Sequence, residues 1–189
     1  MHVAATPRLM TTEEFLALPD DGVERWLING QLRERSMTYR NRWHSRTLTC
    51  VAYVLESWLR QQPEPRGLVL SGDAGFRLRR DPDSVVGIDV AYISAEIASH
   101  EFQETTLIEG VPVLAIEILS PSNTVEDIDE KLDSYLQAGV PLVWLIDPHF
   151  RTVTIYRPGQ PPEMVNVHQE ISADPHLPGF RVPVAQLFA

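Results

Sequence analysis

The pattern of hydrophobic and polar positions predicts helices that alternate with strands. Apolar side chains in 41–62 recur at the three- and four-residue spacing of an amphipathic helix, which Pro63 ends. The same spacing predicts a second long helix over 123–138, ended by Gly139. A short helix is expected near 11–18, where a threonine can cap its first turn.

Strands are predicted from short apolar runs that are bounded by turn residues. The pair Asn29-Gly30 lies between 25–28 and 31–35 and is typical of a tight β-hairpin, because both residues tolerate a positive φ. Further strands are expected near 68–70, 75–78, 85–93, 113–119, 142–147 and 152–156, with a short one near Val165.

Length and composition indicate one globular domain over residues 1–189. The chain has 43% hydrophobic and 22% charged residues, enough to form a core without disulfides. Its longest apolar runs, 111–116 and 142–146, are far shorter than the ~20 residues of a membrane span. Residues 1–10 lack the features of a secretion signal, so we expect a cytoplasmic protein without a membrane partner. The single Cys50 lies in an apolar helical pattern and predicts a buried thiol.

Charge is distributed unevenly along the chain. The net charge is −10, yet residues 25–80 contain eleven arginines against four acids, so this segment carries +7 and the remainder −17. Two interpretations remain open, a random fluctuation and a basic face that approaches phosphate. If nucleic acid binds, we expect Arg77, Arg79 and Arg80 to contact its backbone.

Common catalytic motifs are absent from the sequence. It contains no GxGxxG, Walker, GxSxG or HExxH pattern, and its six histidines show no metal-ligand spacing. Dinucleotide-binding, P-loop, serine-hydrolase and zinc-protease functions therefore lose support.

Two acids interrupt strands that are otherwise apolar. Glu117 lies within 113–119, and Asp89 lies between Ile88 and Val90 in 85–93. A buried carboxylate is costly unless it is paired, hydrogen-bonded or bound to a metal. Each acid alone could belong to a strand end or a sheet edge. Together they predict a site for a hard cation such as Mg²⁺.

Lys131 is the only lysine among sixteen basic residues. At 100° per residue it lies on the flank of the apolar face of the predicted helix, so its ammonium can reach back to the sheet. The alternative is a solvated helix position at which Lys131 pairs with Glu126 or Asp127.

A series of motifs resembles the Uma-two family of restriction endonucleases, in the PD-(D/E)xK nuclease superfamily. In chain order they are Asp89-Val-Ala-Tyr, Ala115-Ile-Glu-Ile-Leu-Ser-Pro-Ser122, Lys131 with Tyr135, Ala138-Gly-Val140 and Trp144-Leu-Ile-Asp-Pro148. The resemblance extends to 11–18 and 22–32 at the beginning of the chain and to 177–180 near its end.

The resemblance implies an α/β (α+β), restriction-endonuclease-like fold, with a mixed central β-sheet flanked by helices and an N-terminal β-hairpin. It makes Asp89 and Glu117 the motif acids. Leu119 stands where the superfamily motif has its lysine. Lys131 resembles a replacement for that lysine, supplied from the adjacent helix. Ile88 stands in place of the usual proline, with little effect on the chemistry.

Two accessory residues follow from the same comparison. Trp26 stands where the family has a further glutamate, and Glu24, two residues earlier on the same strand face, is the candidate substitute. His44 matches a position at which the family often has a histidine, although a histidine at the start of a helix can equally be structural.

The implied function is metal-dependent endonuclease activity. Asp89, Glu117 and the backbone carbonyl of Ile118 would bind Mg²⁺ or Mn²⁺, and Lys131 would orient the attacking water or stabilise the oxyanion. The expected partners are nucleic acid, with DNA first, and a second copy of the chain in a homodimer. The alternatives are a catalytically inactive binding or scaffold protein on a nuclease-like fold and an enzyme for another phosphoester.

Overall fold

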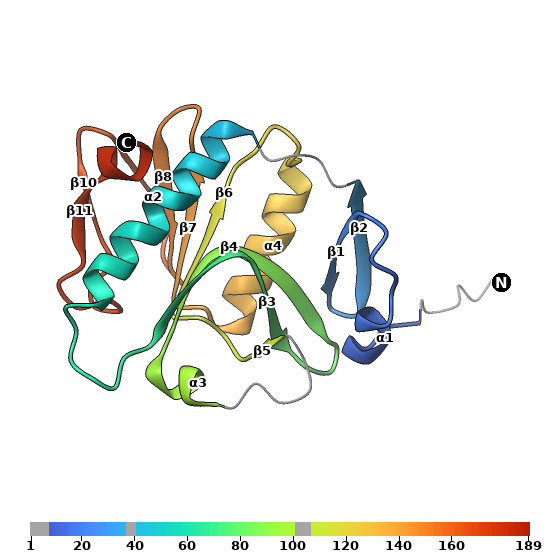
Figure 1. The fold of residues 1–189 in the computed structure, drawn as a ribbon. Helices are drawn as coiled ribbons and strands as arrows, with labels where there is room; N and C mark the ends of the chain where they lie inside the picture. Colours follow the sequence, from blue (N-terminus) through green and yellow to red (C-terminus); the bar gives the residue numbers. More distant parts are fainter. Residues whose placement is uncertain (1–7, 37–40, 101–106) are drawn as a thin grey trace.

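The computed structural model describes residues 8–36, 41–100 and 107–189, and a mixed β-sheet with flanking helices dominates it (Figure 1). In the described residues the main sheet has nine strands, in the order β2-β1-β4-β6-β7-β8-β9, and β3 pairs with both β4 and β5. The strands of this sheet are β1 (Val23–Ile28), β2 (Gln31–Ser36), β3 (Leu68–Arg79), β4 (Ser84–Ile93), β5 (Ile108–Glu109), β6 (Leu114–Ile118), β7 (Leu142–Asp147), β8 (Thr152–Tyr156) and β9 (Glu163–Asn166). The strands β10 (Glu170–Ser172) and β11 (Arg181–Pro183) form a separate small sheet.

The helices are α1 (Thr12–Leu16), α2 (Arg42–Leu59), α3 (Ala95–Ser99) and α4 (Val125–Ala138), followed by a 3₁₀ helix over Val184–Phe188. Each of the two long helices begins at a side-chain cap, Asn41 for α2 and Thr124 for α4. Among the described residues, none of these helices has the length and apolar character needed to cross a bilayer.

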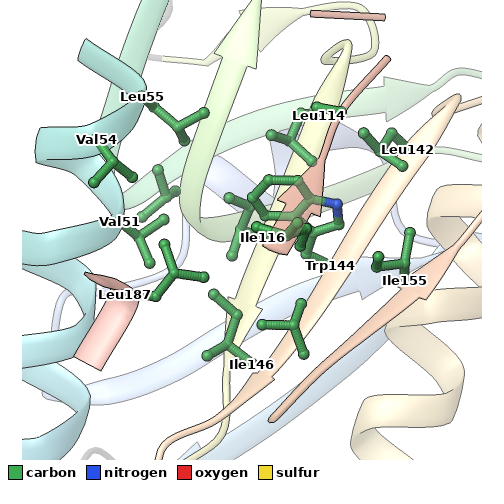
Figure 2. Close-up of a cluster of buried hydrophobic side chains, with 14 of the residues drawn as sticks. Val51, Val54, Leu55, Leu114, Ile116, Leu142, Trp144, Ile146, Ile155 and Leu187 are labelled. Carbon is green, nitrogen blue, oxygen red and sulfur yellow. The ribbon is translucent and has the colours of Figure 1, made fainter. Parts of the chain in front are cut away.

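The two long helices pack on opposite faces of the sheet. Val51 and Leu55 of α2 belong to a buried cluster with Ile116 and Trp144 (Figure 2). The neighbouring strand residue Ala115 belongs instead to the cluster that contains Tyr135 of α4. Because consecutive strand residues point to opposite faces, α2 covers one face and α4 the other.

Most predicted elements are confirmed. The Asn29-Gly30 turn joins β1 to β2 with φ values of 50° and 73°. The two long helices, β4 and the strands from β6 to β9 lie where the sequence places them. Cys50 is buried, as its helical pattern predicts.

The prediction of two separate strands near 68–70 and 75–78 is wrong. Both belong to β3, whose pairing with β4 is irregular between Ser71 and Ala74. The pair Gly72-Asp73 predicts a turn between two strands, whereas in the structure it forms a bulge within one long strand. Five short elements, α3, β5, β10, β11 and the 3₁₀ helix, are not predicted because their apolar patterns are too short.

The sheet forks in its centre. β4 pairs with β6 from Val90↔Ile116 to Tyr92↔Leu114, and its other end pairs with β1 at Leu27↔Val85. Between these two ladders β4 leaves β6. The side chains next to the fork therefore lie where the continuous sheet gives way to an opening.

Candidate active site

Asp89 and Glu117 lie on the two strands at the fork. The last β4–β6 pair is Val90↔Ile116, so Asp89 and Glu117 occupy the next position, opposite each other across the opening. Both are buried, with 4% and 6% of their surface exposed. The structure thus brings together the two acids that interrupt apolar strands.

Helix α4 supplies the partners of Glu117. The Nζ atom of Lys131 lies 3.2 Å from Oε1 and 3.0 Å from Oε2 of Glu117, and the hydroxyl of Tyr135 donates a hydrogen bond to Oε1. Lys131 and Tyr135 are four residues apart, so they lie on the same face of the helix. Lys131 also donates to the carbonyl of Gly87 at 3.1 Å.

Burial controls the ionisation of this pair. Burial raises the pKa of Glu117 from 4.5 to about 7; the neighbouring charge of Asp89 adds to the rise, and Lys131 and Tyr135 only partly oppose it. For Lys131, burial favours the neutral amine, yet the charges of Glu117 and Asp89 outweigh it and raise the pKa. The lysine is therefore a charged ammonium, and the carboxyl of Glu117 titrates near neutral pH.

These contacts decide between the two interpretations of Lys131. Its ammonium reaches the sheet, so the alternative of a solvated pair with Glu126 or Asp127 is wrong. Asp127 instead accepts the backbone N–H of Thr124 in the capping box of α4 and lies 3.7 Å from Arg35. The catalytic role of Lys131 stays a prediction.

Asp89 is held by donors from two other elements. Its Oδ2 atom accepts the backbone N–H of Ile118 at 2.8 Å and lies 3.3 Å from Nε2 of His44. Burial alone would raise the pKa of Asp89, but His44, the Ile118 N–H and Lys131 outweigh it and lower the pKa. In the described residues these contacts all fall on Oδ2, which leaves Oδ1 without a protein donor.

His44 enters the site from the opposite face of the sheet. It lies in the first turn of α2, where the cap Asn41 accepts its backbone N–H, and only 2% of the residue is exposed. Its ring reaches Asp89 because the sheet is open at the fork. Its Nδ1 atom has no hydrogen-bond partner among the described residues.

The second accessory residue is Glu24. It forms an ion pair with Arg35 at 2.8 Å, and Arg35 also bonds the carbonyl of Ser122 just before α4. The structure therefore groups His44 with Asp89 and links Glu24, through Arg35, to the segment before α4.

Sequence reasoning assigned no role to two groups near the site. Helical periodicity predicts a core position for Tyr135, and only its spacing from Lys131 could have indicated the contact with Glu117. Asp73 lies in the bulge of β3 with a φ of 58°, and its charge contributes to the raised pKa values of Lys131 and Tyr135. The glycine before Asp73, inside an apolar strand pattern, is the signal that could have found it.

The available donors fit a hard divalent cation. Among the described residues no three His, Cys, Asp or Glu side chains gather into a complete metal cage. Mg²⁺ does not require one, because it commonly takes one or two carboxylates and completes its shell with water and phosphate. The free Oδ1 of Asp89, the carboxylate of Glu117 and the carbonyl of Ile118 form such a partial set, in which a metal would compete with Lys131 for Glu117.

The basic segment is largely neutralised by ion pairs. Arg77 is 7% exposed and is paired with Glu109 and Glu13, and Arg80 also reaches Glu109. Arg77 is therefore unavailable to phosphate in this structure, because acids distant in the sequence fold onto it, whereas the expected contacts of Arg79 and Arg80 stay predictions. The arginines of 25–80 with ion pairs in the described structure are Arg25, Arg33, Arg35, Arg60, Arg66, Arg77 and Arg80.

Two comparisons with known proteins found relatives of this chain. The model of the Uma2 family, described as "Putative restriction endonuclease", matches residues 12–185. The chain belongs to the Uma2 family. Membership in this family supports nuclease activity and, in general terms, the use of a divalent metal ion. No curated protein matches the chain.

A solved structure similar to this chain is the crystal structure of "a putative nuclease belonging to DUF820" from Anabaena variabilis. The TM-score is 0.79 at 22% sequence identity, and the match covers 95% of this chain and 97% of the other. At this identity the likeness shows the fold, and it confirms the predicted mixed sheet with flanking helices.

Proposed function

We propose that this Uma2 protein is a metal-dependent nuclease that hydrolyses phosphodiester bonds of DNA. The observation that carries the proposal is the buried ion pair of Lys131 and Glu117, beside Asp89 at an opening in the sheet. Titratable groups with strongly perturbed pKa values that cluster in this way are typical of active sites.

A purely structural role explains the cluster poorly. A buried ion pair is weak support for stability, because the cost of removing two charges from water offsets their attraction. Apolar residues would fill the same space between apolar strands at lower cost. The cluster also leaves the Oδ1 atom of Asp89 and the Nδ1 atom of His44 without protein partners in the described residues.

Each residue has a distinct role in the proposal. Asp89, Glu117 and the carbonyl of Ile118 hold Mg²⁺ or Mn²⁺, which when bound activates water and neutralises charge on the phosphate. Lys131 presents an ammonium to the attacking water or to the developing oxyanion. Tyr135 and His44 are positioning residues, since they hold Glu117 and Asp89 through hydrogen bonds.

A cleavage assay tests the proposal. Labelled single-stranded and duplex oligonucleotides and a supercoiled plasmid are incubated with the wild-type protein in Mg²⁺, in Mn²⁺ and in EDTA. We expect cleavage with either metal and none in EDTA. Glu117→Gln should lower the rate by on the order of 100-fold or more. The matched control is Glu126→Gln, an exposed acid of the same α4 helix.

Three results would overturn the proposal. Cleavage that persists in EDTA would exclude the metal, and an equal rate in Glu117→Gln would place the chemistry elsewhere. Metal binding without cleavage of any of these substrates would support the scaffold alternative instead.

A further inference from the structure

A cavity of about 940 Å³ lies at the end of the sheet next to the proposed active site. It is formed where the N-termini of α2 and α4 approach the carboxyl end of β6, together with the β7–β8 turn (Figure 1). Its volume is at the upper end of the roughly 300–1,000 Å³ that is usual for small-molecule sites.

The cavity shares three elements with the catalytic cluster. On α2 its wall residues Trp43 and Thr47 flank His44 in the sequence. After β6, Leu119 directly follows Ile118, and on α4 Ile128 lies about one turn before Lys131. A ligand in the cavity would therefore contact the same segments that carry His44, Glu117 and Lys131.

The walls combine apolar and aromatic surface. Leu119, Leu145 and Ile128 provide aliphatic contacts. Trp43 is 58% exposed although it is a large apolar side chain, and the guanidinium of Arg42 lies 4.3 Å from its ring centroid. Exposed aromatic rings beside arginines are what nucleic-acid bases stack on.

The cations at this cavity differ from the other arginines. Arg46 and Arg151 line the cavity and Arg42 lies beside it, and within the described residues none of the three pairs with the side chain of an aspartate or glutamate. Arg46 uses one nitrogen, Nε, on the carbonyl of Ala189, and Arg151 lies over the ring of Phe188. Their terminal nitrogens are available to phosphate oxygens, which require charged planar donors.

Two acids also line the cavity, and their surroundings differ. The Oδ1 atom of Asp147 accepts the backbone N–H groups of His149 and Phe150 at 2.8 and 3.0 Å, so it is engaged in the turn after β7. Asp129 is exposed on α4 and can accept a hydrogen bond from an amino group of a base. The cavity thus offers a stacking surface, cations and an exposed carboxylate acceptor.

We infer that this cavity binds one unpaired nucleotide next to the scissile phosphate, so that the substrate is single-stranded DNA. This inference rests on the proposed nuclease function and names its substrate class. A cavity of about 940 Å³ has the size of a small-molecule site, which suits one unpaired nucleotide, and a duplex would need more phosphate contacts from a chain whose net charge is −10. One splayed strand needs only a stacking ring and a few cations.

Fluorescence anisotropy with a labelled 12-nucleotide oligo(dT), in EDTA to prevent cleavage, tests the inference; the probe length follows the roughly 4–16-nucleotide footprints of single-strand sites. We expect tighter binding of this strand than of the same strand annealed to its complement. Trp43→Ala should weaken binding about 5- to 150-fold through the loss of base stacking. The matched control is Tyr53→Ala, since Tyr53 is a 71% exposed aromatic residue of the same α2 helix outside the cavity.

Salt dependence provides a second readout. Three phosphate contacts, by Arg42, Arg46 and Arg151, predict a slope of log K against log salt of about −2 for a single strand. Arg151→Gln should lower the steepness by about 0.7, whereas Arg60→Gln, an exposed arginine outside the cavity, should leave it unchanged. Equal affinity for duplex and single strand, or equal binding by Trp43→Ala and Tyr53→Ala, would overturn the inference.

The two proposals fail in different ways. If duplex is cleaved with metal and Trp43→Ala cleaves as fast as wild type, the nuclease proposal stands and the single-strand inference is wrong. If oligo(dT) binds through Trp43 but no substrate is cleaved in Mg²⁺ or Mn²⁺, the cavity assignment stands and the nuclease proposal is wrong.

Discussion

At the scale of single residues, the two carboxyl groups of the site have different surroundings and therefore different pKa values. Asp89 receives hydrogen bonds from a backbone N–H and a histidine, and its pKa is lowered. Glu117 is buried against Lys131 and Tyr135, and its pKa is raised to about 7. Two acids whose pKa values are pushed apart in one site are typical of a division of labour in catalysis.

The raised pKa of Glu117 makes a prediction about stability. Below pH 4.5 both the folded and the unfolded carboxyl are protonated, and the stabilising effect of the higher folded pKa is fully present. It is lost as the pH rises through about 7, because the folded protein must then bury the charge. The unfolding free energy of wild type should therefore fall by on the order of 3 kcal/mol, relative to that of Glu117→Gln, between mildly acidic and mildly basic pH.

Urea unfolding of both proteins in EDTA, at several pH values across this range, checks the prediction. The difference in unfolding free energy between wild type and variant is the relevant quantity, since titrating groups that do not interact with Glu117 cancel. A difference that does not change with pH would show that Glu117 titrates normally in the folded protein.

His44 makes a prediction about metal affinity. It holds Asp89 without being a proposed ligand, and loss of such a supporting hydrogen bond typically weakens metal binding or activity about 10- to 100-fold. Calorimetric titration of His44→Ala with Mn²⁺ should show a loss of this size, whereas the exposed His168→Ala should bind as wild type does. Unchanged affinity in His44→Ala would make the histidine structural.

At the scale of elements, the fork between β4 and β6 decides what the sequence can reveal. Asp89 and Glu117 can be found because each interrupts an apolar strand, and Lys131 can be found from helical periodicity. The contact between His44 and Asp89 cannot, because it depends on an opening between strands that are not consecutive in the chain. Likewise, the acids that neutralise Arg77 come from two distant segments.

Helix α4 positions Lys131, and its C-terminal end can be tested by substitution. Gly139 has a φ of 91°, and a Cβ atom added there would meet nothing within 4 Å, so only the backbone conformation opposes a side chain. Gly139→Ala should lower the unfolding free energy by about 1–2 kcal/mol. Gly139→Asn should cost less, because asparagine tolerates the left-handed region. Equal urea midpoints for glycine, alanine and asparagine at this position would contradict the left-handed end of α4.

At the scale of the whole molecule, most charged side chains of the basic segment form ion pairs within the fold. Most arginines of residues 25–80 pair with acids. Arg42 and Arg46, which pair with no acidic side chain in the described residues, lie at the cavity near the proposed active site. The net charge of −10 therefore does not oppose a nucleic-acid substrate that needs few phosphate contacts. The expected homodimer stays a prediction.

Metal binding should stabilise the whole fold. At a free Mg²⁺ concentration of about 100 times its dissociation constant, binding adds about 2.7 kcal/mol, which corresponds to a Tm increase of roughly 5–10 °C for a chain of this size. Differential scanning calorimetry should show this increase for wild type and a much smaller one for Asp89→Asn. The same increase in both proteins would mean that the cation binds elsewhere.

The central claim is that the ammonium of Lys131 serves catalysis at this site, and Lys131→Arg tests it most directly. Arginine keeps the positive charge and has a similar helix propensity, so fold and metal affinity should change little. Its planar, larger and permanently protonated group cannot replace a compact ammonium between Glu117 and Gly87. The decisive measurement is the metal-dependent cleavage rate of Lys131→Arg, with metal affinity measured on the same sample. We expect a loss on the order of 100-fold or more with metal binding retained. Full cleavage by Lys131→Arg would contradict the account.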